Sequence, residues 1–151
     1  MVGINRAQQH RNFVRSMNEQ GILDHHFGYL ETLQSDDNPL YISQLLGSFF
    51  RNAEAHIEEI TRYMSEARFN FVNVHDTAHQ LKGASANIGG CRVALACQEL
   101  LQACYNKDKE GCFTSLERVK QEYNILHENL RRFCEFERAN HAADEARRCR
   151  H

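Results

Sequence analysis

The sequence predicts an all-α fold, an antiparallel four-helix bundle with two additional N-terminal helices and therefore six helices in total. Three observations support this fold class. Apolar residues recur at three- and four-residue spacing through every long segment. The alternating β-branched runs typical of strands are missing, and the only proline is Pro39. Because 151 residues are enough for one domain, we expect a single domain over residues 1–138 and a polar tail over 139–151.

The N-terminal part is expected to hold two short helices and one long helix. Residues 5–18 carry only a thin apolar stripe, so this helix should pack at the periphery. Apolar residues at helical spacing between 23 and 33 predict a short second helix. A third helix should run from about 39 to 67, with Asn38 as its N-cap and Pro39 in its first position.

Three further helices should complete the bundle. The fourth runs from about 69 to 88, and Gly89-Gly90 should end it or form a tight corner, because glycine accepts the left-handed conformation. A fifth helix carries apolar residues from 93 to 104, and the sixth carries a heptad seam that starts at Phe113. Past residue 138 the seam is lost, so residues 139–151 either fray or prolong the helix as a solvated end.

Composition excludes several classes of function. A formal net charge of −2 gives no electrostatic reason to bind nucleic acid. No apolar run approaches the roughly 20 residues of a membrane helix, and residues 1–20 lack the apolar core of a signal peptide, so we expect an intracellular protein. The six cysteines should then be reduced, with Cys97 and Cys104 acting as small core residues; redox sensing or an intermolecular disulfide is the alternative.

One stretch stands out, residues 79–90, which read HQLKGASANIGG. At about 100° per residue, His79 lies roughly 130° from the centre of the apolar face of its helix and should project into solvent. The same arithmetic places Gly83 and Ala86 beside it, with Gly90 a further turn along if the helix persists. Glycine inside a helix costs about 1 kcal/mol relative to alanine, so something must offset that loss at Gly83.

These placements predict that another protein approaches His79. Small residues leave the imidazole unshielded, Lys82 can direct its ammonium group at a phosphoryl oxygen, and Gln80 or Ser85 can add a hydrogen bond if the rotamers reach. Imidazole suits phosphoryl exchange because its neutral nitrogen is nucleophilic at cellular pH. The helix offers no general base, metal-binding carboxylate pair or nucleotide loop, so His79 would carry phosphate while a partner supplies most of the catalysis.

The stretch resembles the histidine-containing phosphotransfer family, in particular the plant type that acts in two-component phosphorelays. That family's signature reads His-Gln-Leu-Lys-Gly-Ser-Ser-x-x-Ile-Gly-Ala. Ala84 stands where the family often has serine and Gly90 where it usually has alanine, so a hydroxyl contact is lost while the surface stays low. The similarity extends from about residue 15 to 137, through Gly21-Ile22-Leu23-Asp24 with Phe27, Asn38-Pro39, Phe49-Phe50, Glu110-Gly111-Cys112 and Gln121-Glu122-Tyr123.

The resemblance implies that His79 is the phosphoacceptor and that Lys82, Gln80 and Gly83 support it. The chain would accept a phosphoryl group from the receiver-domain aspartate of a hybrid sensor histidine kinase and pass it to response regulators, as in cytokinin signalling. It would be a phosphocarrier rather than an enzyme, with no cofactor of its own and with Mg²⁺ on the partner's receiver domain. We expect a monomer in the cytoplasm and nucleus, with neither nucleic acid nor membrane as a partner.

Receiver docking is expected to use apolar residues of the first two helices. If Ile22, Leu23 and Phe27 are exposed, they could form a patch that holds a receiver domain. Ala86 and Gly90 would extend the same surface along the helix of His79. A charged residue in place of Ile22 or Phe27 should then weaken binding and leave the fold intact.

Two other readings remain open. His75-Asp76-Thr77-Ala78-His79 has the spacing of a zinc-protease HExxH motif, with aspartate in place of glutamate. A metal-binding helical protein using His75 and His79 is therefore an alternative, although no third ligand is identifiable and we expect no metal site. A structural or adaptor bundle without phosphotransfer is the other alternative, but it leaves Gly83 and Lys82 unexplained.

Overall fold

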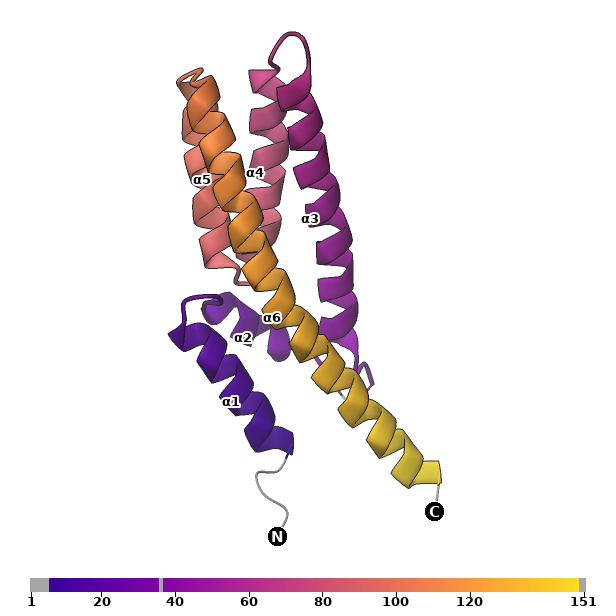
Figure 1. Cartoon of the computed structure of the whole chain (residues 1–151). Coiled ribbons are helices and arrows are strands. Elements are labelled where there is room, and N and C mark those ends of the chain that lie inside the picture. Colours follow the sequence, from indigo (N-terminus) through magenta and orange to yellow (C-terminus); the bar gives the residue numbers. More distant parts are fainter. Residues whose placement is uncertain (1–5, 36, 150–151) are drawn as a thin grey trace.

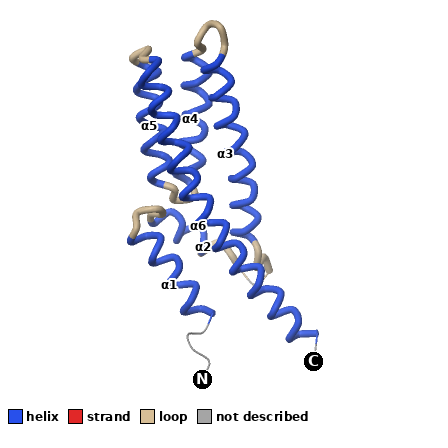
Figure 2. Tube along the Cα trace, viewed as in Figure 1, coloured by secondary structure: helices blue, strands red, loops and turns tan. Residues whose placement is uncertain are grey.

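The computed structural model describes residues 6–35 and 37–149, which form helices and no strand (Figure 1). Figure 2 shows these helices joined by short loops. The prediction of an all-α fold with six helices is confirmed. The helices are α1 (Arg6–Glu19), α2 (His25–Glu31), α3 (Tyr41–Ser65), α4 (Phe71–Asn87), α5 (Cys91–Tyr105) and α6 (Lys109–Cys149).

Helices α3 to α6 form the predicted antiparallel bundle, each running opposite to the one before it (Figure 1). The two N-terminal helices lie at the end of the bundle where α4 turns into α5, and there α1 packs on α6 and α2 on α4. Helix α6 has 41 residues, which is roughly 60 Å at the rise of an α-helix. It therefore extends past the bundle, so residues 139–149 prolong the helix rather than fray.

The core consists of two apolar clusters stacked along the bundle axis. One cluster lies toward the α3–α4 loop and contains residues of all four bundle helices, such as Ile60, Val74, Leu100 and Leu116. The other lies at the opposite end and adds residues from α1, α2 and the loop between them. The N-terminal segment thus completes the core instead of resting on its surface. None of the described helices combines the length and apolar character needed to cross a membrane.

The corner between α4 and α5 anchors α2. Gly89 has φ +85, as predicted from its position after the helix. Its carbonyl oxygen accepts a 2.9 Å hydrogen bond from the backbone N–H of Asp24, and the Asp24 carboxylate caps α2 by accepting from the backbone N–H of His26. A Cβ on Gly89 would lie 2.9 Å from the backbone nitrogen of Phe27. Glycine is needed here for both its conformation and its size.

His10 ties the three helices of this end together. Its Nδ1 lies 2.6 Å from the Glu137 carboxylate on α6, and its Nε2 contacts the Glu31 carboxylate on α2. The ring also packs edge-on against Phe133, with centroids 5.2 Å apart. Hydrogen bonds to Glu137 and Glu31 raise the pKa of His10 to about 9, against the opposing effect of burial. His10 is therefore positively charged at neutral pH and links α1 to the carboxylates of α2 and α6.

Two details of the helix ends differ from the prediction. Asn38 does not cap α3 and Pro39 is not its first residue, because the helix begins at Tyr41 and has Leu40 at the N-cap position. The Gln34 side chain instead accepts a 3.1 Å hydrogen bond from the backbone N–H of Ile42. Phe113 was expected in the core seam of α6 but is exposed, and the preceding residue, Cys112, is fully buried in the core at this end of the helix instead.

Four of the six cysteines are core residues, whereas Cys91 is partly buried and Cys149 is exposed. Cys97 and Cys104 are buried, as predicted, and all six side chains are free thiols. Burial raises the pKa of the Cys97 thiol to about 12, and likewise that of Cys104. Protonated, enclosed thiols are poor nucleophiles, so these two act as small hydrophobes.

Candidate functional site

His79 lies near the middle of α4, on the side that faces solvent. The neighbouring core positions Ala78 and Leu81 are fully buried, which fixes the rotation of the helix and turns His79 outward. The prediction that the imidazole projects into solvent is confirmed. Its one described ring neighbour is His75, one turn earlier, with the two rings parallel and their centroids 6.5 Å apart.

Lys82 lies one turn after His79, on the edge of α4 that meets α5. Its ammonium group donates a hydrogen bond to the side-chain oxygen of Gln98 on α5. This contact holds the cation at the rim of the exposed face, where two of its three donors stay available to an anion. Gln98 was not among the predicted site residues, although its distance along the chain from the glycine corner gave a signal. Lys82 precedes the corner at Gly89 by nearly as many residues as Gln98 follows it. Two antiparallel helices joined at that corner therefore bring the two side chains together.

Gly83 and Ala86 form a low surface beside His79. Gly83 is exposed, and a Cβ built on it would have no heavy atom within 4 Å. Ala86 is half-buried one turn further on, and Gln80, which follows His79 in the chain, is exposed. The structure thus brings His79, Lys82, Gly83 and Ala86 together, with Gln80 flanking them.

Gly90 and Ser85 do not belong to this exposed face. α4 ends at Asn87, so an angle extrapolated to Gly90 along the same helix has no meaning, and Gly90 is buried at the start of α5. A Cβ there would lie 2.8 Å from the Leu126 side chain. The Ser85 hydroxyl is also fully buried, so it cannot reach a phosphoryl group on His79. Gly90 therefore has a packing role, and the prediction that it is a docking residue is wrong.

The expected docking patch of Ile22, Leu23 and Phe27 is also wrong. These side chains are 4%, 2% and 0% exposed and belong to the core at the α2 end of the bundle. The Phe27 ring packs edge-on against Phe133 of α6, with centroids 5.3 Å apart. Helical spacing showed that these residues share a face, but not that α2 turns that face into the bundle. An adaptor that works through exposed residues at these positions loses its basis.

Other apolar side chains are exposed near His79. Val72 on α4 is 69% exposed and Tyr105 on α5 is 81% exposed. With His75, these two residues line a shallow groove of about 210 Å³ between α4 and α5. Leu95, 60% exposed, lies one turn before Gln98 on α5. Sequence reasoning did not single out these residues, because an isolated apolar residue on the polar side of a helix is common.

The metal alternative gains no third ligand from the structure. Within residues 6–35 and 37–149, one group of three side chains has possible ligand atoms within 4.8 Å of one another, and it consists of Asp24, His25 and His26. His75 and His79 are not part of such a group. An HExxH-type site needs a further ligand and a base in a cleft, whereas these two rings lie parallel on an open face.

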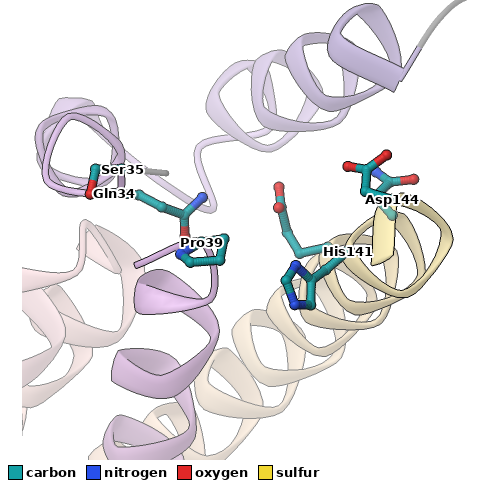
Figure 3. A pocket seen from close by; sticks show the side chains of 7 residues that line it. Gln34, Ser35, Pro39, His141 and Asp144 are labelled. Carbon is teal, nitrogen blue, oxygen red and sulfur yellow. The ribbon is translucent and has the colours of Figure 1, made fainter. Parts of the chain in front are cut away.

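A separate hollow of about 280 Å³ lies between the α2–α3 connection and the C-terminal part of α6 (Figure 3). None of the predicted site residues lines it. Its walls are polar, with His141 and Asp144 on α6 facing Gln34 and Pro39 across the hollow. The face that carries His79 has the shallow groove between α4 and α5 instead, which suits a protein partner better than an enclosed small molecule.

Comparison with known proteins agrees with this helical bundle. The family model described as the Hpt domain matches residues 44–133. Histidine-containing phosphotransfer protein 2 of Arabidopsis thaliana is 34% identical over 124 residues, which are 82% of this chain and 80% of that protein. The chain belongs to the histidine-containing phosphotransfer (Hpt) domain family.

The fold of a solved relative agrees over nearly the whole chain. The crystal structure of the histidine-containing phosphotransfer protein MtHPt2 from Medicago truncatula is similar with a TM-score of 0.85 and 29% identity, over 93% of this chain and 96% of that one. A rice relative that is 28% identical over 116 residues is named pseudo histidine-containing phosphotransfer protein 2. Family membership alone therefore does not assign phosphotransfer, and the residues of each chain must be considered.

Proposed function

We propose that this chain is a phosphorelay intermediate in which His79 accepts a phosphoryl group from the aspartate of one receiver domain and passes it to another. The observation that carries the proposal is the exposed imidazole with a fixed cation one turn away and an open glycine beside it. Each feature favours an anionic group that arrives on a second protein. A pseudo member would not require this combination.

The transfer needs little from this chain beyond position and charge. The lone pair of one imidazole nitrogen of His79 forms the new N–P bond, while the acyl–phosphate P–O bond breaks and its electron pair leaves on the receiver carboxylate. The ring becomes positively charged and can release its remaining N–H proton to water. Lys82 stabilises the charge on the transferring oxygens, and phosphoryl transfer depends mainly on such positioning and electrostatics. The reverse steps deliver the group to the next aspartate.

The proposed partners are receiver domains of hybrid sensor histidine kinases and of response regulators, in a cytokinin-type pathway of the cytoplasm and nucleus. Mg²⁺ would be bound by the receiver, where it neutralises the phosphoryl oxygens. Docking would use the face of α4 that carries Gly83 and Ala86 together with the adjoining edge of α5. Val72, Leu95 and Tyr105 supply the exposed apolar area on this face, in place of the buried α2 residues.

Phosphorylated receiver domain provides the direct test. Incubation with this protein should transfer label to His79 in an acid-labile, alkali-stable form, and His79→Gln should abolish the transfer. His141→Gln is a matched control, because it removes a half-exposed histidine from the distant end of α6. Both variants should keep the helical circular dichroism of the parent. Label that persists in His79→Gln would place the phosphate elsewhere and refute the proposal.

A further inference from the structure

His75 has a relation to His79 that the transfer described above does not use. The two imidazole planes differ by 3° and their centroids lie 6.5 Å apart. The His75 side chain is 46% exposed, and its Nδ1 lies 3.4 Å from the Asp76 carboxylate. It is thus a second imidazole on the same open face, accessible to whatever His79 carries.

The direction in which helical side chains point places the ring of His79 near the turn that carries His75. Cα–Cβ bonds tilt toward the N-terminus of a helix, so a side chain covers the turn before its own Cα. His79 therefore leans toward the turn of His75, and Lys82 leans toward the turn of His79. A phosphoryl group on His79 would lie between Lys82 on one side and His75 on the other.

We propose that His75 is a second phosphoryl-contacting residue, which as an imidazolium holds the oxygens of the group carried by His79. The proposal rests on the proposed function of His79 as phosphoacceptor. Lys82 provides a permanent charge, and a protonated His75 would add a second charge on the other side of the phosphoryl group. The retained phosphoryl group would then be favoured more strongly on the acidic side of neutrality.

The groups that face His75 come from two elements. On α4 they are Asp76 and His79. From α5 and the connection that follows it, Cys104, Tyr105 and Lys107 line the same groove. Asp76 is the anion in this set and Lys107 the cation, so neither sign of charge dominates around the ring. A dianionic phosphoryl group on His79 would be the strongest charge near His75.

The test loads His79 with phosphoramidate, a small donor that requires no receiver domain. Attack by the imidazole nitrogen forms the N–P bond, and the donor's P–N bond breaks with its electron pair leaving on ammonia. Initial loading rates are compared at pH 6 and pH 8.5 for the parent, His75→Gln and His75→Lys. His141→Gln is again the control. All four should give the same circular dichroism, because the substituted side chains are at least partly exposed.

At pH 6 the parent should load about fivefold faster than His75→Gln, which is the upper range for an exposed charge pair. At pH 8.5 the two should agree within about 1.5-fold, because the advantage depends on the imidazolium form. His75→Lys should keep the advantage at both pH values. Equal rates for the parent and His75→Gln at pH 6, or no advantage of the lysine variant over the glutamine variant at pH 8.5, would overturn the role of His75.

Phosphoramidate loading and transfer from a receiver domain together separate the two proposals. If phosphoramidate loads His79 with the expected dependence on His75 but phosphorylated receiver domains transfer nothing, the relay function fails and the His75 contact stands. If receivers transfer phosphate normally and the His75 variants are indistinguishable from the parent, the contact fails and the relay stands. A parent protein whose His79 takes phosphate from neither donor overturns both.

Discussion

Gly83 allows a test in which stability and phosphotransfer should move in opposite directions. A Cβ at this position meets nothing within 4 Å, so alanine fits without displacing any described atom. Glycine is disfavoured in a helix interior by about 0.8–1.0 kcal/mol relative to alanine. Gly83→Ala should therefore raise the free energy of unfolding by about 1 kcal/mol, which for a domain of this size raises Tm by about 2–4 °C.

The effect on transfer should have the other sign. If a receiver surface approaches α4 closely at Gly83, an added methyl group acts as overpacking in that interface, which typically costs about 1–3 kcal/mol. This corresponds to a roughly 5- to 150-fold slower transfer from phosphorylated receiver domain at subsaturating protein. Gly83→Leu should slow it further, because the larger side chain covers more of the face beside His79.

Rapid-quench measurement of label transfer, with urea unfolding of the same samples, checks both parts. Gly47→Ala is the matched control, since it lies inside α3 and its Cβ would meet only the Arg51 guanidinium at an ordinary 3.7 Å. It should stabilise the bundle similarly and leave transfer unchanged. Normal transfer rates in both Gly83 variants would refute the argument that this glycine keeps the surface low for a partner.

Three other predictions concern the rest of the chain. His10→Gln should remove stability mainly at low pH: the raised pKa of His10, about 9, means that its contribution is complete below about pH 6.5 and lost as pH rises through 9. Urea unfolding of parent and variant at pH 6 and pH 10 measures this, and an equal difference at both values would contradict it. Phe27→Ala should lower the free energy of unfolding by about 3–5 kcal/mol, because the ring is fully buried; an unchanged urea midpoint would show that α2 is not part of the core. Tyr105→Ser should weaken receiver binding in titration calorimetry while changing stability by at most about 0.5 kcal/mol, whereas Ile125→Ser, at another exposed apolar position, should leave binding unaltered.

The helical period predicted the parts of the site that depend on one helix. His79 faces outward because Ala78 and Leu81 are buried on the same helix, and that rotation can be counted from the sequence. The fold class follows from the same pattern, repeated along the chain. Gly89 is likewise local, since its positive φ reflects a helix end and not a distant partner. These features are set by residues within a few turns of one another.

The helical period does not show which part of the protein, if any, covers the apolar face of a helix. Ile22, Leu23 and Phe27 were correctly grouped on one face, yet whether that face meets solvent depends on where α2 docks. The Asp24 bond to the Gly89 carbonyl fixes that docking, and it joins residues 65 positions apart. The Lys82–Gln98 contact has the same character, because it depends on the register of α4 against α5.

The glycines of the motif show how the chain's own geometry can be separated from the demands of a partner. Gly89 has a left-handed backbone and touches Phe27, and Gly90 packs against Leu126 where a Cβ would clash. Both are therefore explained by the corner between α4 and α5. Gly83 has neither a positive φ nor a neighbour within 4 Å, so its helical cost is not offset by any described contact within the chain. We infer that the reason is a surface that approaches from outside, because Gly83 adjoins His79. Gly47 in α3 also lacks a close neighbour, so comparing the two substitutions tests this inference more cleanly than a change at either corner glycine.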